Sequence, residues 1–284
     1  MIIDSQTNMV YLAEGLSYYE EAYRNLLYAL NREHIHTETL SRTKSHKHVW
    51  VRDFMPIQLD KNSFLLYKYQ PDYLEDDEDY IPNYKAIVRN LKLEHKTTSI
   101  IIDGGNVVKC GDKVIMTDKI FCDNIWLNDF ALIAELEELM EAQLVIIPWD
   151  RFEIFGHADG MVRYISGNRV LLNNYVNFDL WLRDDLFEVL SSHFTVEQLE
   201  FHTPKCNKLS WAYLNFLQTK NCIFVPGLHA KEDPLAVKQI QMYYPDYKVI
   251  QIQGCEHLAK DGGALNCISW NILADMPEWP KEES

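Results

Sequence analysis

Strands, helices and polar loops recur in a fixed order along this chain, and the recurrence constrains the fold more than any single motif. The clearest helix-to-strand steps are predicted at about 180–192 to 195–196, 210–219 to 222–226, and 233–243 to 248–252. Several ββαβ-like units in series, each ending in a polar loop, favour an α/β repeat fold over a doubly wound parallel sheet.

The first half of the chain has the same alternation. A helix is predicted from 129 to 141, with Asn128 or Asp129 as its N-cap. Residues 98–102 read Thr-Ser-Ile-Ile-Ile and predict a strand that delivers Asp103 into a Gly-Gly turn.

One domain is predicted for residues 1–284. The chain is long for a single domain, but large α/β and repeat architectures reach 284 residues as one unit. No stretch rich in Gly, Ser or Pro divides it. Apolar residues make up 47% of the sequence, which is enough for a sizeable core.

The charge balance favours some partners over others. The sequence has 27 basic and 42 acidic residues, a formal net charge of −15. We therefore expect no nucleic-acid partner and no anionic membrane partner, while a cationic substrate is allowed.

A cytoplasmic location is predicted. No run of about 18 apolar residues is present, and the first residues lack a basic segment followed by an apolar one. None of the six cysteines forms a CxxC pair, so most are expected to be buried, reduced thiols.

Four short segments carry the candidate chemistry. They are Trp50–Asp53, Ile102–Asn106, Gly156–Gly160, and the run 260–270 that contains Cys267. Cys267 follows a glycine pair and precedes an apolar strand-like stretch. A thiol, an imidazole and two or three carboxylates together suggest nucleophilic attack on a cationic carbon.

A guanidinium carbon explains this set of residue types. Two carboxylates can hold the N–H edges of a guanidinium bidentately and aim its carbon at a thiolate. A bound cation or a nearby protonated histidine lowers the thiol pKa. An imidazole can protonate the departing ammonia and then activate water. His157 and Asp159 are two residues apart on an extended segment, so both can line one pocket.

These segments resemble a known family. Their order and spacing over roughly residues 48–272 are similar to those of the agmatine deiminase and bacterial-type peptidylarginine deiminase family, among the guanidine-modifying enzymes. The segments that carry the resemblance are Trp50–Pro56, Asp103–Asn106, Gly156–Asp159 and Gly262–Ile268, supported by Trp211–Phe216, Ile223–Pro226 and Tyr244–Asp246.

The resemblance implies a pentein-type α/β propeller of about five ββαβ units around a pseudo-fivefold axis. It also implies catalysis through a covalent S-alkylthiouronium on Cys267. His157 would be general acid and then base, and Asp53 and Asp159 would clamp the guanidinium. No metal and no organic cofactor are implied. The implied substrate-binding residues are Trp50, Arg52, Asp103, Gly104, Gly105 and Asn106.

The chain departs from the family pattern in several places. Asn266 replaces the His that usually precedes the nucleophile, Met55 replaces the usual Gly before Pro56, and Asp103 stands where Glu is more frequent. The usual Trp- and Pro-rich opening is not visible in residues 1–20. These differences leave the substrate open.

Several functions remain in competition. The leading one is a deiminase of agmatine or a similar small guanidino compound, followed by one acting on peptidyl or free arginine. An amidinotransferase would use the same thiouronium. A cysteine acyl-hydrolase would use Cys267 and His157 but would not need Asp53. A degenerate binding protein with this fold is a further alternative.

Three further features of the sequence bear on binding. The acidic stretch 72–79 predicts a surface loop, or a lid that attracts a cationic substrate. His34, His36, His46 and His48 form two H-x-H pairs, but without a third ligand at useful spacing they predict no metal site. Arg163 is a candidate for binding a substrate carboxylate. A homo-oligomer is possible, but the sequence does not indicate its size.

Overall fold

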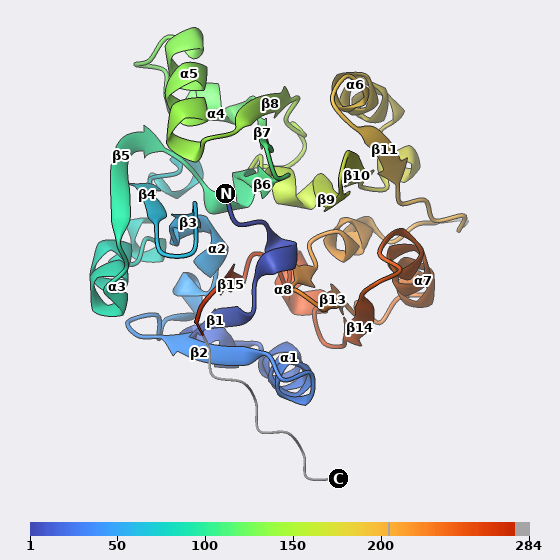
Figure 1. Ribbon diagram of the computed structural model, residues 1–284. Coiled ribbons are helices and arrows are strands. Elements are labelled where there is room, and N and C mark those ends of the chain that lie inside the picture. The colour runs from blue at the N-terminus through green and yellow to red at the C-terminus, as the bar shows by residue number, and fades with distance from the viewer. Residues whose placement is uncertain (204, 276–284) are drawn as a thin grey trace.

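The computed structural model describes residues 1–203 and 205–275, and the strands in this part of the chain form five sheets of three strands each. The sheets follow one another in chain order around a common centre (Figure 1). The prediction of about five ββαβ units in an α/β repeat fold is confirmed.

One repeat illustrates how the sequence forms each sheet. Strands β6 (Val108–Lys109) and β7 (Lys113–Thr117) pair antiparallel, helix α5 (Asp129–Met140) crosses over, and β8 (Gln143–Ile147) pairs parallel with β7. A crossover helix is the usual way to join parallel neighbours. The helix buries Leu132, Leu136 and Met140, which lie four residues apart on one face.

The ends of α5 confirm the predicted cap. The Asn128 side chain accepts a hydrogen bond from the backbone N–H of Phe130 at 3.1 Å. Glu141 follows the last turn in a left-handed conformation with φ 53°, which ends the helix.

Three other sheets repeat this order of strand, strand, helix and strand. Their elements are β3 (Ile57–Gln58), β4 (Phe64–Lys68), α3 (Tyr84–Leu91) and β5 (His95–Ile101); β9 (Val162–Ser166), β10 (Arg169–Leu172), α6 (Leu180–Ser191) and β11 (Thr195–Gln198); and β12 (Leu217–Gln218), β13 (Cys222–Pro226), α7 (Asp233–Tyr243) and β14 (Lys248–Ile252).

The fifth sheet joins the two ends of the chain. Strand β1 (Met9–Ala13), helix α1 (Glu20–Arg32) and β2 (His36–Leu40) come first in the sequence, and β15 (Ser269–Ile272) adds antiparallel to β1. In Figure 1 the red C-terminal strand lies beside the blue first strand. This pairing closes the ring and brings the residues just before β15 to its centre.

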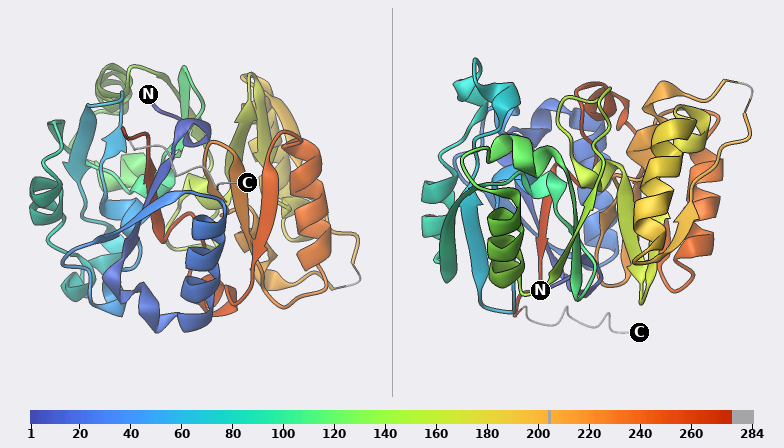
Figure 2. Two further views of the ribbon diagram at one scale, coloured as in Figure 1. Left: turned by 60° about the horizontal axis from the view of Figure 1, so that its bottom comes forward. Right: turned by 90° about the horizontal axis from the view of Figure 1, so that it is seen from above.

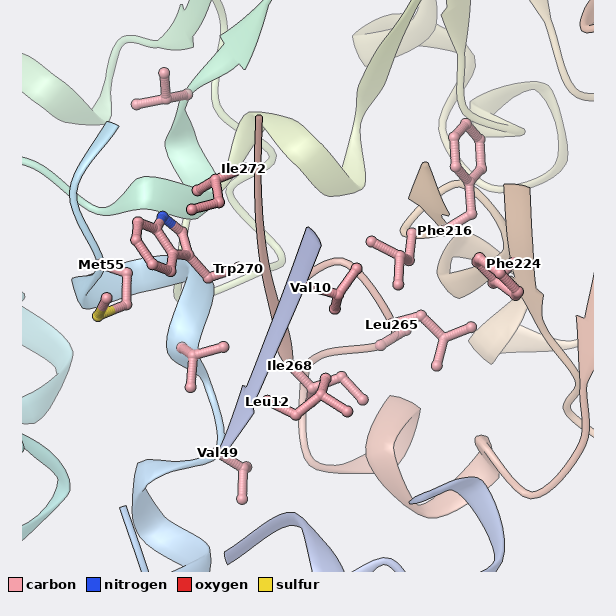
Figure 3. Packing of buried hydrophobic residues seen from close by; sticks show 14 of the residues in the cluster. Val10, Leu12, Val49, Met55, Phe216, Phe224, Leu265, Ile268, Trp270 and Ile272 are labelled. Atoms are coloured by element: carbon pink, nitrogen blue, oxygen red, sulfur yellow. The ribbon is translucent and has the colours of Figure 1, made fainter. Parts of the chain in front are cut away.

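The closure is anchored by Trp270. Its side chain is 3% exposed, its indole N–H donates to the Pro56 carbonyl at 2.9 Å, and its ring centre lies 5.1 Å from that of Tyr11. Figure 3 shows Trp270 among Met55, Ile272 and other buried apolar side chains. The core of the closing sheet therefore joins segments from both ends of the chain.

One predicted helix is wrong. The sequence predicts a helix at about 210–219, but a 3-10 helix spans Lys208–Tyr213 and the backbone then extends into β12. The extended conformation is favoured because Leu217 and Gln218 pair with β13 and Asn215 accepts hydrogen bonds from the segment before β15. Local apolar spacing does not reveal these long-range partners.

The interpretation of residues 1–284 as a single domain stays a prediction.

No helix among residues 1–203 and 205–275 is long and apolar enough to cross a membrane.

The N-terminus lies at the lower edge of the right-hand view in Figure 2, and α8 (Glu256–Lys260) lies at the upper edge. The loops that follow α8 and β8 meet at the upper end of the ring.

We expect Trp270→Ala to lower the free energy of unfolding by about 3–5 kcal/mol, because it leaves a cavity where the two ends of the chain meet. Urea unfolding followed by circular dichroism measures the change. Trp181 is 85% exposed, so Trp181→Ala should cost no more than about 0.5 kcal/mol. Equal losses in the two variants would contradict the importance of ring closure.

Candidate active site

Four different parts of the ring bring their polar side chains to one end of its axis. Asp53 lies on the short helix α2 (Val51–Phe54), and Asp103 follows β5. His157 and Asp159 flank the start of a 3-10 helix before β9, and Cys267 precedes β15. The five side chains are all close to fully buried. The structure therefore brings together the predicted thiol, imidazole and carboxylates.

The Cys267 thiol is 5% exposed and lies 3.7 Å from Oδ2 of Asp159. Burial, together with the charges of Asp159 and Asp53, raises the pKa of Cys267 well above its ordinary value. The Cys267 backbone N–H donates to Oδ1 of Asn215 at 3.3 Å. Without a bound cation, this thiol is protonated at neutral pH.

His157 lies between two carboxylates. Its Nε2 is 2.9 Å from Oδ2 of Asp103, and its Nδ1 is 3.8 Å from Oδ1 of Asp53. Burial alone would lower the pKa of His157, but Asp53, Asp103 and Asp159 together raise it to about 10. The ring is thus an imidazolium at neutral pH, and both of its N–H groups face acidic oxygens.

Negative charge is in excess around this imidazolium. Burial raises the pKa of Asp53 to about 7, and the charges of Asp103 and Asp159 add to the rise while His157 opposes it. Oδ1 of Asp53 and Oδ1 of Asp103 are buried and accept no hydrogen bond. An acceptor left unpaired in a buried site costs free energy, so these two oxygens are suited to a cationic donor.

Two cavities meet at the thiol. One of about 290 Å³ is lined by Asp150, Glu153, Trp211 and their neighbours, and one of about 130 Å³ by Trp50, Asp53 and Tyr73. Both are also lined by Phe155, His157, Gly262 and Cys267. A substrate can therefore reach Cys267 with room for a tail on one side of the thiol.

The two glycines after Asp103 are needed for close packing. A Cβ on Gly105 would lie 2.5 Å from Nδ1 of His157 and 2.8 Å from Oδ1 of Asp53. A Cβ on Gly104 would overlap the Arg52 carbonyl. The predicted residues Gly104 and Gly105 thus let the chain approach the site, while Trp50 lines the smaller cavity.

Five of the six predicted substrate-binding residues line neither cavity: Arg52, Asp103, Gly104, Gly105 and Asn106. The Arg52 guanidinium donates to the carbonyl and side-chain oxygens of Asn266 and to Oδ1 of Asn271. The Asn106 side chain accepts from the backbone and hydroxyl of Thr117 at 2.9 and 3.0 Å. For both residues the substrate-binding assignment is corrected: these buried groups use their hydrogen bonds to hold loops beneath the site.

Arg163 is also turned away from the site. Its guanidinium pairs with Asp4 at 3.0 Å and lies 4.7 Å from the centre of the Phe216 ring. Arg163 lines neither cavity at Cys267. The interpretation of Arg163 as a binder of a substrate carboxylate is therefore wrong.

Sequence reasoning gave no role to two residues at the site. Asn215 accepts hydrogen bonds from the backbone N–H groups of Ala264 and Cys267, and its own Nδ2 is buried without a partner. Tyr73 donates to Oδ2 of Asp103 at 2.9 Å. Asn215 lies within one of the resembling segments, and Tyr73 within the acidic stretch, but neither segment signals these contacts.

The acidic stretch 72–79 covers part of the site. Asp72 pairs with the buried Lys119 at 2.7 Å, Tyr73 contacts Asp103, and residues 75–79 are exposed. The position agrees with the predicted surface loop. Its lid function stays a prediction.

No group of three or more His, Cys, Asp or Glu side chains within residues 1–203 and 205–275 is arranged to hold a metal ion. His157 lies between Asp53 and Asp103 and pairs with both carboxylates.

The sequence matches the family of Porphyromonas-type peptidyl-arginine deiminases over residues 3–272. A Pectobacterium atrosepticum protein named "Putative agmatine deiminase" is 24% identical over 217 residues, 61% of this chain and 57% of that protein. A Shewanella baltica protein of the same name is 35% identical over 65 residues, 23% of this chain. The matches span only 17% and 57% of the lengths of these curated relatives.

Two solved structures share the fold. A C. jejuni agmatine deiminase with substrate bound superposes with a TM-score of 0.76 at 18% identity, covering 95% of each chain. An agmatine deiminase of Enterococcus faecalis superposes with a TM-score of 0.75 at 17% identity, covering 95% of this chain and 94% of the other. The pentein-type propeller predicted from the resemblance is confirmed.

We expect the His157 ring to stay protonated through pH 8, with a pKa of about 10. Asp103→Asn removes a hydrogen-bonded negative charge, which disfavours the imidazolium, so the pKa should fall toward the ordinary value of 6.5. NMR titration of the ring protons measures both values. Asp77→Asn changes an exposed carboxylate and should leave His157 unaffected. A wild-type ring that titrates near 6.5 would contradict this electrostatic account.

Proposed function

The chain belongs to the Porphyromonas-type peptidyl-arginine deiminase family, and from that premise we propose that it is a cysteine-dependent hydrolase of guanidinium groups. One observation carries the proposal: the carboxylates of Asp159 and Asp53 line the two cavities that meet at the buried Cys267 thiol, and Oδ1 of Asp53 is buried without a hydrogen-bond donor. A planar cation with several N–H groups supplies donors to these carboxylates.

The proposed substrate completes the charge balance. Its guanidinium lies between Asp53 and Asp159 and presents its carbon to Cys267, whose Sγ is 3.7 Å from Asp159. The added positive charge lowers the pKa of the thiol, which releases its proton to solvent. The thiolate is then formed only when the electrophile is in place, because burial and the charges of Asp159 and Asp53 hold the pKa of the unliganded thiol well above its ordinary value.

In the proposed reaction the Cys267 thiolate attacks the guanidinium carbon and a C–S bond forms. Collapse of the tetrahedral adduct breaks one C–N bond, and His157 gives its proton to the departing ammonia. An S-alkylthiouronium remains. Water, losing a proton to His157, attacks the same carbon. The C–S bond then breaks, the hydroxyl proton of the adduct passes to the Cys267 sulfur, and a ureido product leaves the regenerated thiol, with His157 protonated as at the start.

His157 has to change from acid to base between the two halves. Three carboxylates raise its pKa to about 10 in the unliganded site, so it starts as an acid. The bound cation neutralises part of that negative field, which lowers the pKa toward the working pH. His157 can then accept a proton from water.

Agmatine, or a similar small alkylguanidine, is the substrate that we propose first. The larger cavity beside Cys267 is lined by Asp150 and Glu153, whose carboxylates suit an amine at the far end of the tail, although Lys208 also lines it. Arg163, the residue expected to bind an α-carboxylate, is paired with Asp4 elsewhere. Peptidylarginine, free arginine and amidinotransfer to an added amine are the alternatives.

We propose that a small cationic substrate is the only partner that the reaction requires. The proposed location is the cytoplasm. The chain as a whole is proposed to be one catalytic domain. Neither nucleic acid nor a membrane has a role in it.

The test is ammonia release from agmatine, arginine, arginyl peptides and methylguanidines, with no amine acceptor added. We expect agmatine or a close analogue to be hydrolysed and Cys267→Ala to be inactive. Cys222→Ala alters a buried cysteine at the start of β13 and is the matched control. This variant should retain activity. Full activity in Cys267→Ala would falsify the covalent mechanism, and ammonia that appears only with an amine acceptor would indicate an amidinotransferase.

Asp53→Asn in the same assay separates a guanidinium hydrolase from an acyl-hydrolase. Loss of one charged clamp should reduce kcat/KM by about ten- to a hundredfold. Acyl transfer needs no second carboxylate at the electrophile, so a mild effect of Asp53→Asn would favour the acyl-hydrolase.

A further inference from the structure

The side chain of Asn266 connects the acidic end of the site to a buried cation. Asn266 is 2% exposed, and its Nδ2 donates to Oδ2 of Asp159 at 2.6 Å. Its Oδ1 accepts from the Arg52 guanidinium at 3.2 Å. An amide offers a donor on one edge and an acceptor on the other, and it does so without a change of protonation.

The orientation of this amide is determined by its two neighbours. A flipped amide would place its oxygen against the Asp159 carboxylate and its NH2 group against the Arg52 guanidinium, two repulsive contacts in a buried site. Arg52 is itself held, because it donates to the Asn266 carbonyl at 3.3 Å and to Oδ1 of Asn271. Asn266 therefore has one allowed arrangement.

The network continues to the far side of the ring. Nδ2 of Asn271 donates to the Thr7 hydroxyl at 2.8 Å and to the Gln218 carbonyl at 2.9 Å. Asp159 is thus connected through Asn266, Arg52 and Asn271 to the segment before β1. Each member is close to fully buried, so the connection is not loosened by solvent.

Asp159 needs such support because its Oδ2 also faces the thiol. That oxygen lies 3.7 Å from Sγ of Cys267, and a thiol proton could bind it in place of the substrate. A charge-assisted hydrogen bond from Asn266 occupies Oδ2 and fixes the plane of the carboxylate. The other oxygen, Oδ1, is then left to receive a guanidinium N–H.

We propose that Asn266 is a positioning residue that orients Asp159 for guanidinium binding through its amide donor, an inference that rests on the proposed function. Asn266 stands where the family usually has His. Unlike an imidazole, an amide does not titrate, so it holds Asp159 in the same way at every working pH.

Asn266→Asp tests the donor. The new carboxyl keeps an acceptor for Arg52 but faces Asp159 with an oxygen, so the two carboxyls can form a hydrogen bond only while they share a proton. We expect agmatine affinity, measured by calorimetry in the Cys267→Ala background, to be close to that of Cys267→Ala alone at about pH 5 and to fall about tenfold or more by about pH 8.

Two further variants separate positioning from general stability. Asn8→Asp makes the same chemical change in an amide that bonds the backbone of Ala274, and it should lower the melting temperature without changing the pH dependence of affinity. Asn266→His retains a ring N–H donor and should therefore bind agmatine more tightly than Asn266→Asp. If Asn266→Asp fails to fold, the affinity of Asn266→His is compared with that of the Cys267→Ala background. An Asn266→Asp affinity equal to that of the background at every pH, or no recovery in Asn266→His, would overturn the proposal.

Alkylation of Cys267 gives a result that does not depend on guanidinium binding. An Asp159 released from Asn266 accepts more strongly from the thiol, so Cys267 should alkylate more slowly at a given alkaline pH in Asn266→Asp than in the wild type, while Asn8→Asp matches the wild type. If no guanidino compound binds to the wild type, the proposed function fails, and the alkylation rates still decide the role of Asn266: equal rates would overturn it.

Discussion

The excess of buried negative charge at one end of the ring is the constraint on which the rest of the site depends. Asp53, Asp103 and Asp159 surround a single imidazolium and a protonated thiol, and two of their oxygens have no donor. Such an arrangement is costly in an empty site. A cationic, planar, multi-donor substrate would relieve this cost and at the same time turn the thiol into a nucleophile, so binding and activation become one electrostatic event.

The fold provides this arrangement only when the ring is closed. The residues of the site come from segments more than two hundred positions apart, and the backbone N–H of Arg52 donates to the Cys267 carbonyl at 3.1 Å. Pairing of β15 with β1 therefore positions Cys267 as well as the last sheet. Beneath the acidic residues, the Arg52 guanidinium and the Asn266 amide hold the loop before Cys267 and Asp159 in place.

The sequence alone predicts features that depend on local patterns and motifs better than features that depend on contacts between distant residues. The repeat of strands and helices could be predicted, and so could the convergence of Asp53, His157, Asp159 and Cys267, because motif order and residue chemistry carry that information. The direction of Arg52 and Arg163 could not, since each turns toward a partner distant in sequence, Asn266 or Asp4. The same holds for Leu217 and Gln218, whose extended backbone depends on pairing with β13. Local patterns do not record these long-range hydrogen bonds.

The proposed covalent bond between Cys267 and the guanidinium carbon can be detected by acid-quenched mass spectrometry during turnover. Peptide mapping should find, on Cys267 alone among the six cysteines, an added mass equal to the substrate less ammonia. His157→Gln, which removes the base for the second half of the reaction, should increase the amount of this species where it still forms. An active wild-type enzyme with no adduct on Cys267, or with the adduct on another cysteine, would contradict the account.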